Sequence, residues 1–149
     1  MKTLPQKSIE KLKSKVKGKV ILPTDPGYNE TRKIWNAMID RRPAVIVQCA
    51  YAADVPHAIS FARDSGLEIS IRGAGHNIAG NAVCDDGVMI DFSKMRDVHV
   101  DAEKRLAHVE PGATLGDVDK ATQAHGLATP LGINSTTGIA GFTLGGGFG

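Results

Sequence analysis

One loop of the sequence combines the residue types that can bind a phosphate group. The stretch from Arg72 to Gly80 reads RGAGHNIAG and follows a short β-branched run. Glycines permit positive φ angles and a close approach of the main chain to a ligand, so that successive N–H groups can converge on an anion. A phosphate or pyrophosphate is therefore the expected ligand. For Gly73-Ala74-Gly75 taken alone, a tight solvent-exposed turn is the simpler interpretation.

Two well-known phosphate-binding motifs do not fit this chain. Ile78 stands where a dinucleotide-binding fingerprint needs its third glycine. Gly18 and Lys19 are followed by Val20 rather than by Ser or Thr, which excludes a P-loop. A ligand of the 72–80 loop would be bound in some other way.

A second candidate segment, residues 130–141, reads PLGINSTTGIAG and carries no charge. Small side chains and hydroxyl groups suit a segment that lies against a flat, polar heterocycle, because backbone and hydroxyl hydrogen bonds then supply the specificity. A glycine-rich connection within a packed core explains the same composition equally well.

Other residues capable of chemistry receive structural interpretations. Four histidines lie on separate expected elements without the spacing of a metal site: His57, His99, His108 and His125. The charges of Asp85 and Asp86 would raise the pKa of the Cys84 thiol, so no nucleophile is expected there. These two acids and Asp91 are assigned turn and strand-end roles in preference to a cation site.

The hydrophobic pattern places the first loop at the end of a strand. Residues 44–48 form a continuous apolar run typical of a strand buried on both faces, and residues 69–72 form a second strand. Between them we expect a helix that begins at residues 54–57 and ends at Gly66, with an apolar face of Val55, Ile59 and Ala62. Such a βαβ unit would make the two strands parallel and adjacent. Ligands of open α/β sheets gather at the carboxyl ends of their strands, where the 72–80 loop begins.

Further elements follow along the chain. Residues 88–92 are expected to form a third strand, and residues 98–100 and 106–109 an antiparallel hairpin. Thr114 and Asp117 indicate a capping box for a helix that ends at Gly126, and its N-terminus, close to Pro111 and Gly112, could face a ligand. A short N-terminal helix would bury Ile9, Leu12 and Val16, and a subdomain boundary is expected near residues 95–98.

Composition limits the class of protein. The chain has 149 residues, 42% of them hydrophobic, and a net charge of +2, which argues against a general nucleic-acid binder. No apolar run suits a membrane span or a secretory signal, so Cys49 and Cys84 are expected to be free thiols in the cytoplasm. Seven of the 17 glycines fall in the last 18 residues. We expect the chain to be a fragment of a longer polypeptide.

With both segments in view, the chain resembles the flavin-binding domain of the vanillyl-alcohol-oxidase-type (PCMH-type) FAD oxidoreductases. The resemblance is greatest to the branch of berberine-bridge-like, glucooligosaccharide-oxidase-like and hydroxynicotine-oxidase-like enzymes. It extends from about Pro43 to Gly149. The motifs that carry it are PAVIV at 43–47, RGAGHN at 72–77, Asp91 with Met95, VEPG at 109–112, and the glycine-rich residues 126–149.

The resemblance implies an α/β (α+β) fold in which two small subdomains hold an extended FAD between them. Residues 1–42 would be a helical or extended lead-in, 43–97 the first subdomain and 98–149 an incomplete second one. It implies a pyrophosphate loop formed by Gly73, Ala74, Gly75, His76, Asn77 and Gly80. It also implies contacts to the flavin and its ribityl chain from Gly112, Gly132, Thr137, Gly138 and Gly141.

His76 matches the histidine that is commonly bonded to the 8α-methyl carbon of the flavin in this branch. The covalent bond is the favoured interpretation, and a simple hydrogen bond to the cofactor is its alternative. Ala74 departs from the usual glycine or serine and would strain the loop at a positive φ. Neither Cys49 nor Cys84 matches the second covalent anchor of some members. The family's catalytic base lies beyond Gly149, so no catalytic residue is assigned.

The resemblance therefore predicts the FAD-binding part of an oxidase or dehydrogenase that oxidises a small alcohol, amine or sugar by hydride transfer to FAD. Its substrate would bind mainly to a C-terminal domain beyond this chain, and neither nucleic acid, membrane nor metal is an expected partner. A non-redox module that binds a nucleotide or phosphate is the alternative from another class. A third possibility is a fragment without a tight ligand that self-associates through residues 139–144.

Overall fold

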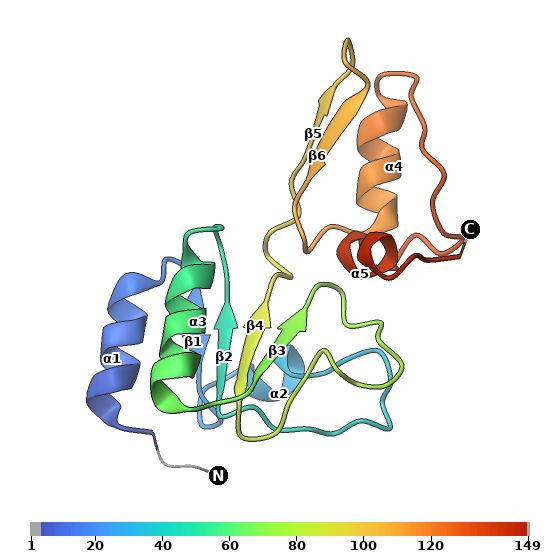
Figure 1. Cartoon of the computed structure of the whole chain (residues 1–149). Coiled ribbons are helices and arrows are strands. Elements are labelled where there is room, and N and C mark those ends of the chain that lie inside the picture. Colours follow the sequence, from blue (N-terminus) through green and yellow to red (C-terminus); the bar gives the residue numbers. More distant parts are fainter. Residues whose placement is uncertain (1–3, 149) are drawn as a thin grey trace.

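Two separate β-sheets organise the chain, as the computed structural model shows for residues 4–148 (Figure 1). The first sheet has the strand order β1-β2-β4-β3, and the second is a hairpin of β5 and β6. Their bounds are β1 Lys19–Ile21, β2 Val45–Gln48, β3 Ile69–Arg72, β4 Val88–Asp91, β5 Val98–Asp101 and β6 Leu106–Val109. The α/β class predicted from the sequence is confirmed, and both sheets carry helices.

The order of strands in the first sheet corrects one prediction. Strands β2 and β3 are parallel, as expected, but β4 lies between them and pairs with both. All four residues of β4 are buried, whereas Ile69 and Ile71 of β3 are exposed. The more apolar strand takes the central position because that position removes both of its faces from water.

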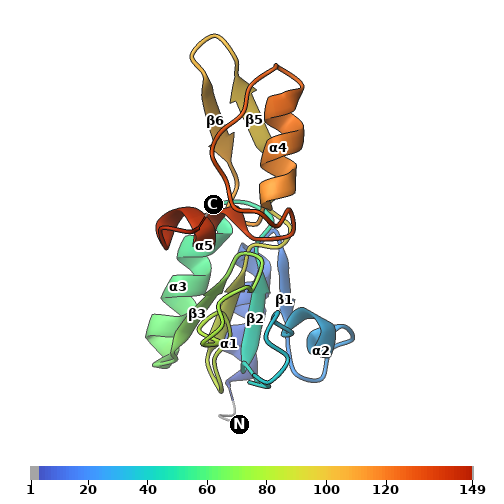
Figure 2. The same ribbon diagram turned by 90° about the vertical axis from the view of Figure 1, so that its right-hand side faces the viewer.

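Two helices cover one face of this sheet. Helix α1 (Gln6–Lys15) and helix α3 (Asp54–Ser65) pack side by side over the strands (Figures 1 and 2). The predicted burial of Ile9, Leu12 and Val16 is confirmed. The predicted apolar face of α3 is partly wrong. Ile59 is 45% exposed, and the buried stripe is Ala58, Phe61 and Ala62, because this rotation of the helix buries the large Phe61 ring.

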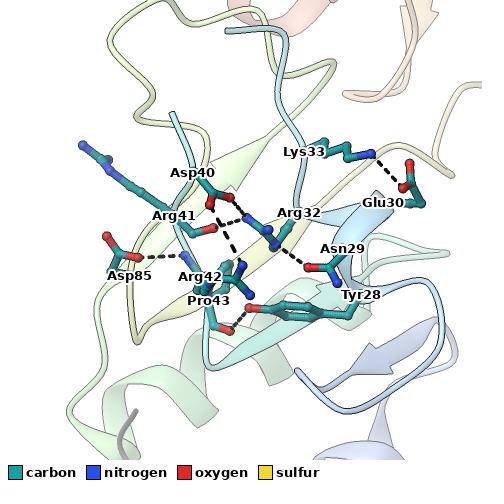
Figure 3. Close-up of polar contacts among 10 residues, drawn as sticks. All are labelled: Tyr28, Asn29, Glu30, Arg32, Lys33, Asp40, Arg41, Arg42, Pro43 and Asp85. Carbon is teal, nitrogen blue, oxygen red and sulfur yellow. Dashed lines mark hydrogen bonds and ion pairs between the residues drawn. The ribbon is translucent and has the colours of Figure 1, made fainter. Parts of the chain in front are cut away.

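The opposite face of the sheet is covered by helix α2 (Tyr28–Thr31) and the segment that follows it. Tyr28 is buried in a second apolar cluster with Ile46 of β2 and Met89 of β4. Its hydroxyl group donates to the carbonyl oxygen of Pro43 at 2.7 Å, a contact drawn in Figure 3. Residues before Pro43 thus form one layer of the first sheet's core.

The second part of the chain consists of the β5–β6 hairpin, helix α4 (Leu115–Gln123) and helix α5 (Ile139–Leu144). The hairpin is confirmed, and so is the capping box, in which Thr114 and Asp117 bond each other's main chain. Helix α4 ends at Gln123, three residues before the predicted end, and a turn leads to Gly126 with φ +64°.

The structure contradicts one further expectation for this part and removes the strand-edge basis of another, the self-association through residues 139–144. The N-terminus of α4 does not face a ligand, because the N–H groups of Leu115 and Gly116 donate to the carbonyl oxygens of Thr137 and Ser135. Residues 139–144 form helix α5, whose main chain is bonded internally, so they offer no strand edge to another copy. Within residues 4–148, no helix has the length and apolarity that crossing a membrane requires.

Candidate functional site

The two segments singled out in the sequence line one pocket. Its volume is about 290 Å³, and its walls come from the loop after β3 and from the start of α5. Figures 1 and 2 both show α5 next to the end of the first sheet. The lining residues are Ile71, Gly73, Ala74, Gly75, His76, Asn77, Ala82, Thr137, Gly138, Gly141 and Phe142. The lining includes no Asp, Glu, Lys or Arg, and its polar side chains are those of His76, Asn77 and Thr137.

Small residues allow the loop after β3 to approach both Pro111 and the 130–141 segment closely. A Cβ atom at Gly73 would lie 3.0 Å from the carbonyl oxygen of Pro111, and one at Gly138 would lie 2.8 Å from the Cβ of Ala74. Ala74 does not have a positive φ, so the strain expected there is absent. Gly75 does have one, φ +75°, which explains glycine at that position.

A buried carboxylate fixes the point at which the loop leaves the sheet. Asp91, at the end of β4, is fully buried and accepts hydrogen bonds from Arg72 Nε and Gln48 Nε2, both at 2.9 Å, and from Ser93 Oγ at 2.8 Å. These bonds join the carboxyl ends of three neighbouring strands, β2, β4 and β3. Because Arg72 directly precedes Gly73, the network orients the first residue of the loop.

The other side of the loop is held by residues 33–41, which lie in the lead-in segment implied by the resemblance. The N–H group of Trp35 donates to the carbonyl oxygen of Gly75 at 3.0 Å, and Asn36 Nδ2 donates to that of Ile78 at 2.8 Å. Arg41 bonds the carbonyl oxygen of Gly80 at 3.2 Å. No sequence motif predicts these hydrogen bonds, because they join segments that are far apart along the chain.

Three of the residues assigned by resemblance lie outside the pocket lining: Gly80, Gly112 and Gly132. Each is in close contact with protein atoms. A Cβ atom would lie 2.8 Å from the Ile39 side chain at Gly80, 1.8 Å from the carbonyl oxygen of Phe92 at Gly112, and 2.7 Å from the Phe142 ring at Gly132. Packing within the protein therefore accounts for glycine at these positions, and their assignment to the cofactor stays a prediction.

The two cysteines are buried and unpaired, as predicted. Burial raises the pKa of Cys49 to about 12, with smaller contributions from Asp54 and Asp91. Burial is also the main cause of the raised pKa of Cys84, and Glu68 supplies the repelling charge. The predicted direction of the Cys84 shift is confirmed, and its main cause is burial. Among residues 4–148, no cluster of three or more His, Cys, Asp or Glu side chains could hold a metal ion.

Comparison with known families agrees with this geometry. Residues 43–149, more than two thirds of the chain, match the family model described as an FAD binding domain. The chain belongs to this family. The match includes both segments that line the pocket, and FAD is accordingly the cofactor of this domain.

Relatives of this FAD-binding domain are named as oxidoreductases. It is 37% identical over 134 residues to (R)-6-hydroxynicotine oxidase of Paenarthrobacter nicotinovorans, a match that covers 90% of the chain and 29% of that protein. It is 36% identical over 137 residues to an FAD-linked oxidoreductase of Bacillus subtilis, covering 92% of the chain and 30% of the relative. The chain thus spans about 30% of the length of these relatives.

Solved structures share its fold. The crystal structure of 6-hydroxy-D-nicotine oxidase from Arthrobacter nicotinovorans superposes with a TM-score of 0.83 at 35% identity, covering 85% of this chain and 28% of that one. A carbohydrate oxidase from Microdochium nivale superposes with a TM-score of 0.80 at 27% identity, covering 90% and 29%. None of these matches supports the alternative of a non-redox binding module.

The pocket of the FAD-binding domain fits part of the cofactor. Ligand pockets commonly measure about 300–1,000 Å³, so 290 Å³ can enclose a portion of a dinucleotide. A Cβ atom at Gly141 would meet no protein atom within 4 Å, although this residue lines the pocket. No contact within the described chain requires glycine there, which leaves the space beside Gly141 for a ligand.

Proposed function

We propose that the FAD-binding domain described here forms the cofactor half of an FAD-dependent oxidase or dehydrogenase. The whole protein would take a hydride from a C–H bond of a small alcohol, amine or sugar. The observation that carries this proposal is the convergence of residues 73–77 and 137–141 on one pocket within a domain of the FAD-binding family. Support for the substrate class comes from relatives named as a nicotine oxidase and a carbohydrate oxidase.

Within this function, the chain's residues bind and orient the cofactor. The main chain of residues 73–77 would contact the pyrophosphate, and Thr137, Gly138 and Gly141 would lie against the flavin end. Bound FAD supplies the hydride acceptor. The absence of charged lining side chains favours recognition through main-chain N–H groups and the Thr137 hydroxyl group.

We further propose that His76 forms a covalent bond to FAD. Its imidazole lines the pocket and, within residues 4–148, makes no hydrogen bond or ion pair, so its nitrogens are available. An imidazole nitrogen would bond the 8α-methyl carbon with loss of one N–H and one C–H bond. The electron pair of the C–H bond would enter the flavin ring, and dioxygen would reoxidise the reduced flavin with release of hydrogen peroxide.

The test is an absorbance spectrum of the full-length protein before and after acid precipitation. A flavin spectrum that remains with the precipitated chain supports both proposals, and the variant His76→Asn should then bind FAD but release it to the supernatant. Release from the unmodified protein would refute the covalent bond alone. A full-length protein that takes up no FAD would refute the proposed function.

We also propose a cytoplasmic location, which the two unpaired thiols of Cys49 and Cys84 support because they suit a reducing compartment. Subcellular fractionation of the source cells, followed by immunoblotting, tests this assignment. The protein is expected in the cytoplasmic fraction.

A further inference from the structure

An exposed tryptophan stacks on the histidine of the pocket. The ring centroids of Trp35 and His76 are 5.8 Å apart, and their planes are inclined by 20°. This geometry lies within the range of offset-stacked aromatic pairs, about 4.5–7 Å between centroids. Trp35 is 63% exposed, so burial in the core does not account for its position.

The stack is the one directional contact of the His76 side chain within residues 4–148. The imidazole has neither a hydrogen bond nor an ion pair there that would select its rotamer. A side chain without such partners samples several staggered rotamers. The indole restricts that freedom while leaving both imidazole nitrogens unoccupied.

The loop that carries Trp35 is itself closed by polar contacts, which Figure 3 shows around Arg32. The Arg32 guanidinium pairs with the carboxylate of Asp40 and donates to the carbonyl oxygen of Arg41 at 3.1 Å and to Asn29 Oδ1 at 2.9 Å. Its side chain is only 10% exposed. The contacts of Arg32 thus connect the two ends of the 32–41 loop.

The same loop is joined to the His76 loop through the main chain. Besides the bond from Trp35 N–H to Gly75, Arg72 Nη1 donates to the carbonyl oxygen of Lys33 at 2.8 Å. The indole and the imidazole therefore project from two main-chain segments that are bonded at the residues next to them. Their stacking follows from a fixed backbone relationship.

We propose that Trp35 is a positioning residue that holds the imidazole of His76 in the orientation in which it meets FAD. This inference rests on the proposed function, in which His76 lines the cofactor pocket. The inference goes beyond the proposed function because it assigns a role to Trp35, a side chain that does not line the pocket. The stack restricts the imidazole before the cofactor arrives, which lowers the entropic cost of the productive geometry.

The first test observes the stack in the protein without FAD by NMR spectroscopy. The ring protons of His76, assigned by their loss in His76→Asn, should be shifted upfield by the indole. Trp35→Leu should remove that shift, and Trp35→Phe should keep part of it. Met38→Ala is the matched control, since Met38 lies on the same loop and is 92% exposed. Its His76 resonances should match those of the unmodified protein.

The second test follows the attachment of FAD. Acid-stable flavin should form about fivefold more slowly in Trp35→Leu, and within twofold of the unmodified rate in Trp35→Phe and Met38→Ala. The circular dichroism spectrum and the thermal unfolding midpoint of each variant should match those of the unmodified protein, which confirms that the substitution leaves the protein folded. Normal attachment in Trp35→Leu, or unchanged His76 resonances, would overturn the inference.

Failure of the covalent bond gives a different result. The unmodified protein could bind FAD and release all of it in acid. In that case the dissociation constant of FAD tests the positioning role of Trp35. Trp35→Leu should then weaken FAD binding about fivefold in the unmodified background and not in His76→Asn. Equal weakening in both backgrounds would overturn the positioning role. A protein that binds no FAD at all would overturn the proposed function together with this inference.

Discussion

Ala74 and Gly138 pack against each other at the point where the His76 loop meets the second part of the chain. A Cβ atom at Gly138 would lie 2.8 Å from the Cβ of Ala74 and 3.0 Å from its main-chain nitrogen. The dihedral angles of Gly138, φ −71° and ψ 129°, suit any residue, so its requirement for glycine is steric. This contact joins the two segments that line the pocket.

The variant Gly138→Ala should therefore destabilise the protein by about 1–3 kcal/mol, the usual effect of an extra methyl group in a packed contact. Combining it with Ala74→Gly should recover part of the loss, because the nearest of the clashing atoms is removed. Urea-induced unfolding of the four proteins of this double-mutant cycle measures the coupling. Identical destabilisation by Gly138→Ala in both backgrounds would show that the two residues do not touch.

Gly141 provides a complementary test, because an added Cβ atom there meets ligand space rather than protein. Gly141→Ala should leave the stability of the FAD-free protein unchanged or raise it by up to about 1 kcal/mol, since alanine is the better helix former. FAD binding should weaken about tenfold, or about 1.4 kcal/mol. Equilibrium dialysis in a His76→Asn background measures this reversible binding.

The matched control is Thr143→Ala in the same helix, α5, because Thr143 does not line this pocket. It changes helix propensity in the same direction and should leave FAD affinity unchanged. Unaltered affinity in Gly141→Ala would place the cofactor elsewhere.

Stability should fall in acid partly through Asp54. Burial opposes its ionisation, but the N–H groups of Ala50, Lys17, Gly18 and Tyr51 donate to the carboxylate and together hold its pKa below the ordinary 3.8. The stabilisation is therefore fully present above the pKa of the unfolded chain. It is lost as pH falls below about 4 and through the lower pKa of the folded state.

The variant Asp54→Asn should lose about 1.5–3 kcal/mol at pH 7, the usual contribution of a hydrogen bond to a charged group. Its stability should then depend less on pH between pH 5 and pH 2 than that of the unmodified protein. Urea unfolding at a series of pH values measures both effects. Asp64→Asn, on the exposed side of the same helix, is the control and should change neither. If Asp54→Asn loses as much stability between pH 5 and pH 2 as the unmodified protein does, this role for Asp54 is contradicted.

The buried thiols should be unreactive. The pKa of Cys49 is raised to about 12 and that of Cys84 is raised as well, in both cases mainly by burial, so little thiolate exists at pH 8. A thiol-specific reagent such as DTNB should modify neither cysteine in the folded protein and both after unfolding. Rapid modification of one thiol in the native state would reveal an opening of the sheet that the structure does not predict.

Local sequence patterns identified most elements but not their neighbours. Thr114 and Asp117 lie three residues apart, and the capping box between them forms from that spacing alone. The hairpin of β5 and β6 is likewise local. The place of β4 between β2 and β3 is not, because it depends on which strand gains most from burial on both faces.

The same distinction applies to the pocket. The RGAGHN motif and the glycine-rich segment were recognisable because glycines and small residues are required by close main-chain approach, a property of each position. Their union in one pocket came from tertiary packing, as did the stacking of Trp35 on His76 and the orientation of Arg72 by Asp91. A hydrophobic periodicity indicates that a residue is buried, but it does not indicate which distant residue packs against it. The sequence by itself therefore determined the local elements and the family of the domain, and only the tertiary structure decided which distant segments contact the cofactor loop.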